Sequence, residues 1–276
     1  MLQRFQSPDL TASTSPTVPA VSAGNTLPHG RVLGAVTVSV VSHGQGHWVR
    51  PLLEQIDSWC GAHVTRAIVT QNLAVSDTQD LAPRRFPIHH RQNPVPLGFG
   101  ANHNAAFRQC DTEWFLVINP DVLIDSDVLG ALTQCEDPSV GLIAPSVWEP
   151  GSGHATQERG VITPWEVFAG RILGRNAPKD VLWFPGMFML FRSEAFASVG
   201  GFDERFHMYC EDYDICARLR RTNWKLLRKS ETHVTHLAQR DSHIHIQYLF
   251  WHLKSLARLW LSTAFWRDWL TVFRQR

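Results

Sequence analysis

Apolar runs alternate with stretches of helical spacing in the first half of the chain. The run GAVTVSVVS at 34–42 is nearly continuous, which is typical of a strand buried on both faces. WVRPLLEQIDSW at 48–59 has apolar residues at helical spacing. The same reasoning predicts strands in VTRAIVTQN, FPIHHRQN and EWFLVINP, and a helix in GANHNAAFRQC. Strands alternating with helices predict an α/β fold with a mainly parallel central sheet.

The second half continues with different elements. VLWFPGMFMLF predicts a strand pair or a bent strand, and Ser193 is the expected N-cap of a short helix that Gly200 closes. EDYDICARLRR predicts a helix with Ile215 and Leu219 on one face, and NWKLLRKSETHVTH a late strand. EPGSGHATQERGVITPW is polar and rich in Gly and Pro, which predicts a mobile loop.

Both ends of the chain differ from this central region. Residues 1–32 are rich in Ser, Thr and Pro and are expected to be a disordered tail ahead of a folded domain at 33–242. Residues 243–276 are expected to form an amphipathic helical extension, with apolar and aromatic residues on one side and basic residues on the other. Two interpretations remain open for 244–276: docking onto the domain, or peripheral contact with an anionic membrane.

Composition narrows the class of protein. The 276 residues carry a formal net charge of +1, so no overall field favours nucleic acid. Five Cys without a C-x-x-C pair are typical of a reduced chain. The first residues show no apolar core of a secretory signal, and no uninterrupted apolar run reaches about 18 residues. We therefore expect a cytoplasmic protein, with the inner face of the plasma membrane as its only membrane contact.

Polar residues stand where the predicted strands end, the edge at which open parallel sheets bind ligands. Ser42-His43-Gly44 follows the first strand, Gln71-Asn72 the second, Asn93 the third and Asn119-Pro120-Asp121 the fourth. Asp125 and Ser126 are the better expected caps for the next helix, which leaves Asp121 for another role. A divalent cation bound to a diphosphate needs only one or two protein carboxylates, and Asp121 suits that role.

Three further groups carry candidate chemistry. Asp212 stands at a helix N-terminus, which keeps a carboxylate ionised and suits a general base, although capping by the Glu211-Asp212 pair is the simpler alternative. His236 ends the late strand, and Arg240 and Ser242 behind it suit phosphate oxygens. Gly98 begins a Gly-x-Gly ahead of a helix, but neither the full dinucleotide fingerprint nor a Walker lysine is present.

The order of these pieces is more specific than any one of them. The chain reads N-x4-G-F-G-A-N-x-N, N-P-D, M-F-M-L-F-R, G-G-F-D-E-R-F-x-M-Y-x-E-D-x-D-x-C-x-R-L and then V-x-H. From about Val36 to Trp260 this closely resembles family 2 glycosyltransferases, especially the rhamnosyltransferase-like group. The resemblance implies a GT-A fold, a nucleotide-diphosphate sugar donor, Mg²⁺ or Mn²⁺ at the diphosphate, and inversion at the anomeric carbon.

The resemblance also implies roles for individual residues. Asp212 matches the catalytic base, and Asp121 and His236 match the metal site. The expected acceptor side holds Phe184, Gly186, Met187 and Glu211, and the expected nucleotide-sugar contacts are Ser42, His43, Gln71, Asn72, Gly98, Asn104, Asn119, Arg240 and Ser242. The Ser42-His43-Gly44 and Gln71-Asn72 strand ends depart from the family pattern, which leaves UDP, dTDP and GDP donors open.

The expected reaction moves rhamnose or another hexose to a hydroxyl of a glycan or lipid-linked glycan in cell-surface polysaccharide synthesis. Two alternatives are weaker. A nucleotidyltransferase should have a lysine in its loop after the first strand, and SHGQGHWVR has none. A decayed transferase that only binds nucleotide sugars or glycans should have lost Asp121 or Asp212, and both are present.

Overall fold

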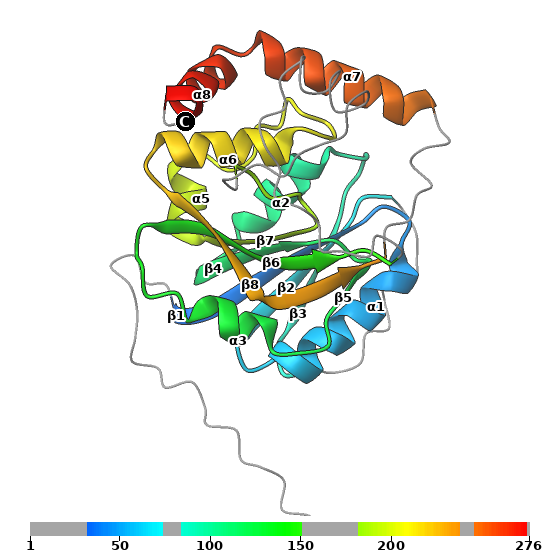
Figure 1. Ribbon diagram of the computed structural model, residues 1–276. Helices are drawn as coiled ribbons and strands as arrows, with labels where there is room; N and C mark the ends of the chain where they lie inside the picture. Colours follow the sequence, from blue (N-terminus) through cyan, green and yellow to red (C-terminus); the bar gives the residue numbers. More distant parts are fainter. Residues whose placement is uncertain (1–31, 74–83, 151–181, 238–245, 275–276) are drawn as a thin grey trace, which may run out of the picture.

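A computed structural model describes residues 32–73, 84–150, 182–237 and 246–274. Its centre is an eight-stranded sheet with the order β3-β2-β1-β4-β7-β6-β8-β5 (Figure 1). The strands are β1 (Val32–Ser42), β2 (Val64–Gln71), β3 (Ile88–Gln92), β4 (Thr112–Ile118), β5 (Val122–Leu123), β6 (Val140–Trp148), β7 (Phe188–Arg192) and β8 (Lys225–His236). The predicted tail lies outside the described residues apart from Val32, which begins β1, and so does the loop at 149–165 apart from Glu149 and Pro150.

The first half of the sheet is parallel, as predicted. β1 pairs in parallel with β2 on one side and with β4 on the other, and β2 pairs in parallel with β3. Val36, Val38 and Val40 are completely buried, as are Phe115 and Val117 in β4. These strands read as continuous apolar runs because helices cover both faces of the sheet.

The second half of the sheet is mixed. β7 is antiparallel to both β4 and β6, whereas β8 runs parallel to β6 and antiparallel to β5. Of the predicted strand pair at 181–191, the C-terminal part forms β7. The strands β5 and β6 were not predicted from the sequence, although Val140–Trp148 is an apolar run that ends at an acid, like the run before Asp121.

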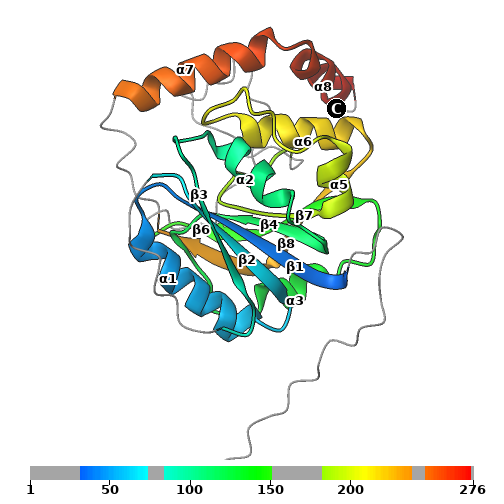
Figure 2. The same ribbon diagram turned by 180° about the vertical axis from the view of Figure 1, so that it is seen from behind.

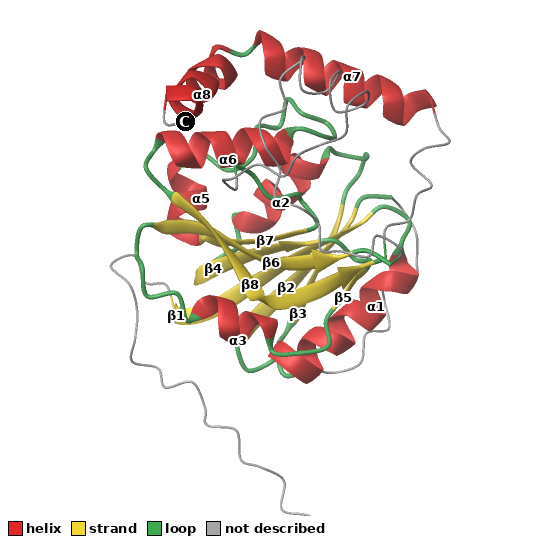
Figure 3. Ribbon diagram, in the orientation of Figure 1, coloured by secondary structure: helices red, strands yellow, loops and turns green. Residues whose placement is uncertain are grey.

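The helices form layers on the two faces of the sheet (Figure 3). On one face lie α1 (Gly46–Gln55), continued by a π-helical turn at Ile56–Cys60, and α3 (Val128–Thr133). The other face carries α2 (Phe99–Phe107), α5 (Ser193–Ser198) and α6 (Glu211–Arg221). α7 (Ile246–Leu261) and α8 (Thr263–Arg274) form an outermost layer beyond α6 in both views (Figures 1 and 2).

Two expected helix caps were wrong. Asp127, not Asp125 or Ser126, caps α3, because its carboxylate accepts a hydrogen bond from the Gly130 N–H. Ser193 is the first residue of α5 rather than its cap. Gly200 closes that helix as predicted, with a φ of 73° that favours glycine.

The C-terminal extension docks onto the domain as two helices rather than one. Asp268 of α8 is buried and forms a 2.6 Å ion pair with Arg220 of α6. Ser255 of α7 is also buried, and its hydroxyl donates to the Met208 carbonyl at 2.8 Å. Within the described ranges, no helix is both long and apolar enough to cross a membrane.

Candidate functional site

The short strand β5 brings Asp121 to His236. Val122 pairs with His236 across the antiparallel β5–β8 bridge, and the Leu237 N–H donates to the Asp121 carbonyl at 3.0 Å. His236 Nε2 consequently lies 3.4 Å from Asp121 Oδ2, and both side chains are mostly buried. A carboxylate and an imidazole that are more than one hundred positions apart in the sequence thus meet at one edge of the sheet.

Glu149 joins this pair from the end of β6. Its Oε1 lies 3.5 Å from His236 Nδ1. Burial disfavours the imidazolium, but hydrogen bonding and charge from Asp121 and Glu149 outweigh it and raise the pKa of His236. Sequence reasoning missed Glu149, and the signal that could have found it is an acid directly after an apolar run, as at Asp121.

Asp212 occupies the first turn of α6, and backbone donors from two elements fix its orientation. The Tyr213 N–H donates to Oδ1 at 2.8 Å, and the Gly186 N–H donates to Oδ2 at 3.3 Å. The helix N-terminus favours the ionised carboxylate. An ionised carboxylate held by backbone N–H groups has the form required of a general base.

The segment before β7 connects the two acidic centres. The Asn119 N–H donates to the Met187 carbonyl at 3.0 Å, and β4 pairs with β7 at Ile118 and Phe188. The neighbouring Gly186 is hydrogen-bonded to Asp212. Residues 186–187 therefore lie between the Asn119–Asp121 turn and the first turn of α6.

Of the residues expected on the acceptor side, Phe184 has a buried side chain. Its side chain is buried with Trp183 and Tyr213 in the core between the sheet and α6. Met187 is partly buried against the core on the other face of the sheet. In this structure the segment presents the backbone of Gly186, rather than the Phe184 ring, next to Asp212.

A tight left-handed turn precedes Glu211 and Asp212. Tyr209 and Cys210 have φ values of 71° and 67°, a region that non-glycine residues rarely adopt. α7 packs on this turn: the Tyr209 ring lies 4.9 Å from the His252 ring, close to the Ser255 bond to Met208. The docked C-terminal helix thus supports the backbone that presents Asp212.

Glu211 is buried beside Asp212. Desolvation, followed by the charge of Asp212, raises the pKa of the Glu211 carboxyl well above its usual range. Its Oε2 has no hydrogen-bond partner among the described residues. Burial and the neighbouring charge of Asp212 therefore favour the protonated form of Glu211.

A buried network of asparagines fills the ends of β2 and β3. The Asn93 amide donates to Asn72 Oδ1 at 2.8 Å and to Asn102 Oδ1 at 2.6 Å. The Asn72 amide donates to His43 Nδ1 at 3.0 Å and to the Leu97 carbonyl at 2.9 Å, and its Oδ1 also accepts from the Leu97 N–H. The structure thus uses the Asn72 amide internally, to hold the loop after β3.

Asn104 and Gly98 also hold backbone in place. The Asn104 side chain exchanges hydrogen bonds with the backbone of Phe202 at 2.9 Å in both directions. A Cβ on Gly98 would stand 2.6 Å from the His207 carbonyl oxygen, which accepts the Phe99 N–H. Both residues therefore fix the loop that leads into α6.

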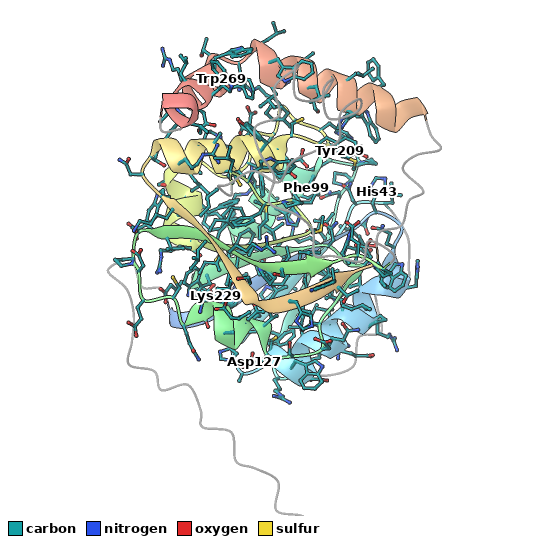
Figure 4. The ribbon with its side chains drawn as sticks, in the orientation of Figure 1. His43, Phe99, Asp127, Tyr209, Lys229 and Trp269 are labelled. Carbon is teal, nitrogen blue, oxygen red and sulfur yellow. The ribbon has the colours of Figure 1, made fainter. Side chains whose placement is uncertain are left out.

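The remaining expected nucleotide contacts are placed as follows. The His43 residue is exposed overall, but desolvation of its ring, followed by the charge of His207, lowers its pKa. Its Nδ1 accepts the Asn72 amide N–H, because that amide nitrogen can only donate. Ser42 is buried and accepts the Gln45 N–H, whereas Gln71 and Asn119 are partly exposed. Figure 4 shows His43, Phe99 and Tyr209 on the same side of the molecule. Arg240 and Ser242 lie outside the described residues.

The donor set around Asp121 fits a divalent cation that a diphosphate helps to bind. Among the described residues, no three His, Cys, Asp or Glu side chains form a site sufficient by themselves. His236 Nδ1 is buried, and it makes a long 3.5 Å ion-pair contact with Glu149 Oε1. One carboxylate and one imidazole suit Mn²⁺, and phosphate oxygens and water would complete the shell.

Solved structures with the same fold bind nucleotides. The mannosyltransferase PcManGT of Pyrobaculum calidifontis, solved with GDP-Man and Mn²⁺, matches with a TM-score of 0.59 at 15% identity over 85% of this chain and 67% of that chain. Residues 1–349 of S. aureus TarS, solved with UDP, give 0.56 at 11% over 74% and 60%. The predicted GT-A fold is confirmed.

Sequence comparison shows the family. A family model described as glycosyl transferase family group 2 matches residues 114–275, which is more than half of the chain. The chain belongs to this family and is a glycosyltransferase. Rhamnosyltransferase WbbL of Escherichia coli K12 is 28% identical over 244 residues, which cover 81% of this chain and 91% of that protein.

A mycobacterial protein is similar over a shorter region. The N-acetylglucosaminyl-diphospho-decaprenol L-rhamnosyltransferase of Mycobacterium tuberculosis H37Rv is 26% identical over 200 residues, which cover 61% of this chain and 65% of that protein. The predicted family and its rhamnosyltransferase-like relatives are thus confirmed.

Proposed function

We propose that this chain is an inverting, metal-dependent rhamnosyltransferase or related hexosyltransferase. It would move the sugar from a nucleotide-diphosphate donor to a hydroxyl of a lipid-linked glycan in cell-surface polysaccharide synthesis, at the inner face of the plasma membrane. The names of the two similar rhamnosyltransferases support the sugar, and the mycobacterial name supports the lipid-linked acceptor. The PcManGT and TarS structures support a nucleotide donor.

The observation that carries this proposal is the placement of two acidic centres on either side of residues 186–187. Asp121, His236 and Glu149 form the centre beside Asn119, and Asp212 forms the centre beside Gly186. A direct displacement needs this division, because the leaving diphosphate and the attacking hydroxyl stand on opposite faces of the sugar. Asp121 and His236 would hold the metal, which stabilises the charge that develops on the diphosphate.

Asp212 would accept the proton of the acceptor hydroxyl as its oxygen attacks the anomeric carbon. The bond from that carbon to the diphosphate oxygen then breaks, and the configuration inverts. The Gly186 and Tyr213 N–H groups hold this carboxylate in its orientation. Glu211 remains protonated, so the site does not place a second full negative charge beside the base.

The test is a transfer assay with nucleotide-diphospho-rhamnose and other nucleotide sugars, Mn²⁺ or Mg²⁺, and a lipid-linked or short-chain glycan acceptor. NMR of the product should show an inverted anomeric configuration. Asp212→Asn should lower kcat by roughly 100- to 10,000-fold and leave the nucleotide Kd unchanged. Retention of configuration, or full activity of Asp212→Asn, would contradict the proposed mechanism.

A further inference from the structure

The two C-terminal helices have an outer face that is apolar despite its exposure. α7 buries Ser255, Leu256 and Leu259 against the domain. On its other side, Phe250, Leu253 and Leu261 are 64%, 57% and 84% exposed. Residues three to four apart share a helix face, so positions 250, 253, 257 and 261 form one stripe opposite the docked side.

Like α7, α8 has one buried side and one exposed apolar side. It buries Phe265 and Val272, while Trp266 and Leu270, four positions apart, are 40% and 44% exposed. Both helices form the layer farthest from the sheet in both ribbon views (Figures 1 and 2). Their unburied sides therefore point away from the domain. We define the outer face as Phe250, Leu253, Leu261, Trp266 and Leu270, with the neighbouring exposed cations Lys254 and Arg267.

The charge of this layer is strongly one-sided. Lys254, Arg258, Arg267 and Arg274 lie in α7 and α8, whose only acid is Asp268. That acid is buried and paired with Arg220 at 2.6 Å. The outer face therefore combines exposed apolar side chains with a surplus of positive charge.

Charge complementarity distinguishes between two possible partners of the outer face, a second copy of the chain and an anionic bilayer. A second copy of the chain related by a two-fold axis would bring these cations against the same cations, which is unfavourable. The surface of an anionic bilayer offers the opposite charge and a hydrocarbon boundary for the apolar side chains.

We propose that the outer face of α7 and α8 binds the surface of an anionic lipid bilayer without crossing it. This inference rests on the proposed function in one respect, which is that a lipid-linked acceptor lies in the same membrane. The inner side of α7 holds the turn before Asp212 through Ser255 and His252. α7 begins on the side of the molecule where His43, Phe99 and Tyr209 lie, so the bound protein would present this side close to the lipid headgroups (Figure 4).

Sedimentation with vesicles tests the inference on the full chain. Phosphatidylcholine vesicles containing 30 mol% phosphatidylglycerol are compared with phosphatidylcholine alone, and wild type should prefer the anionic vesicles. Lys254→Glu with Arg267→Glu should weaken binding to anionic vesicles by at least about tenfold, since each surface cation contributes roughly fivefold. Phe250→Ser with Leu253→Ser and Leu261→Ser should weaken it by a further comparable factor, about tenfold or more.

Matched controls change the same residue types elsewhere. Trp59→Ser removes an exposed aromatic residue after α1, on the opposite face of the sheet, and Arg108→Glu reverses an exposed cation after α2. Neither should alter sedimentation. The inference is overturned if wild type does not bind anionic vesicles, if the controls lose as much binding as the outer-face variants, or if light scattering shows that those variants abolish a dimer.

A water-soluble, short-chain acceptor separates this inference from the proposed function. The outer-face variants should transfer sugar to it at the wild-type rate, because none of their changed residues lies at the site. If wild type shows no transfer to any acceptor, the proposed function fails while vesicle binding still stands or falls by itself. If transfer is normal but vesicle binding is absent, only the membrane inference fails.

Discussion

The two ends of the sheet that surround the site differ in how their polar groups are satisfied. At the ends of β2 and β3, the Asn72 amide and carbonyl groups bond to protein partners. At the ends of β5 and β8 and the start of α6, carboxylates gather around His236 and at Glu211 and Asp212. Buried Glu211 Oε2 lacks a hydrogen-bond partner among the described residues, and buried His236 Nδ1 makes only a long 3.5 Å ion-pair contact with Glu149 Oε1.

This contrast distinguishes residues that stabilise the fold from residues that are available to act on a ligand. A neutral amide with all of its hydrogen bonds made inside the protein stabilises the fold and contributes little to a ligand. Buried charges and orphaned polar atoms cost free energy and are retained where they act on a ligand. The family motif contains both kinds of residue, and the contrast predicts different consequences for substitutions at each end.

The largest expected effect is at the acidic end. Asp121→Asn keeps the size of the side chain but removes its charge, so kcat/KM should fall about 100-fold or more, and Mn²⁺ should no longer enhance nucleotide-diphosphate binding in calorimetry. Asp125→Asn is the matched control, because Asp125 is a nearby exposed acid. Equal losses of kcat/KM in both variants would show that Asp121 has no role beyond that of a nearby acid.

At the asparagine end, the effect should fall on stability. Asn93→Ala leaves Asn102 Oδ1 without the Asn93 donor and Asn72 Oδ1 with only the Leu97 N–H, and the free energy of unfolding should decrease by about 2–3 kcal/mol. Urea denaturation measures this decrease. Gln92→Ala, at the exposed last position of β3, should change the unfolding free energy by less than about 0.5 kcal/mol. An Asn93→Ala variant that is as stable as wild type but binds nucleotide more weakly would contradict a purely structural role for the asparagine end.

The smallest expected effect is on the pH dependence of stability, and it concerns Glu211 at the acidic end. The Glu211 carboxyl has a raised pKa in the folded state, so the unfolded state loses this proton first as pH rises above about 4.3. Stability contributed by Glu211 is therefore present at low pH and lost as pH rises toward the folded pKa. Glu211→Gln should remove that loss and raise the unfolding free energy at neutral pH by about 1–2 kcal/mol. Parallel pH profiles for the two proteins would contradict the buried, protonated state.

The sequence by itself determined the elements whose pattern depends on local periodicity. β1, β2 and β4 were predictable because strands covered on both faces are apolar throughout, and α6 because Ile215 and Leu219 share a buried face. The order of the motifs was enough to indicate the family. Asp212 and Asp121 stand at a helix start and a strand end, as predicted, and their roles as base and metal ligand stay predictions that the family resemblance implies.

Only the tertiary structure decided which polar groups meet. Periodicity reports the face of a side chain and not its partner, so β6 and the approach of Glu149 to His236 were not predicted. The same limit applies to Asn104, whose amide bonds to Phe202, 98 positions away, and to Asn72, whose partners come from the first strand and the loop after the third. An amphipathic pattern likewise does not specify what covers its apolar side. The fold settled this for the inner faces of α7 and α8, because buried Ser255 and Asp268 find partners on the loop before Asp212 and on its helix.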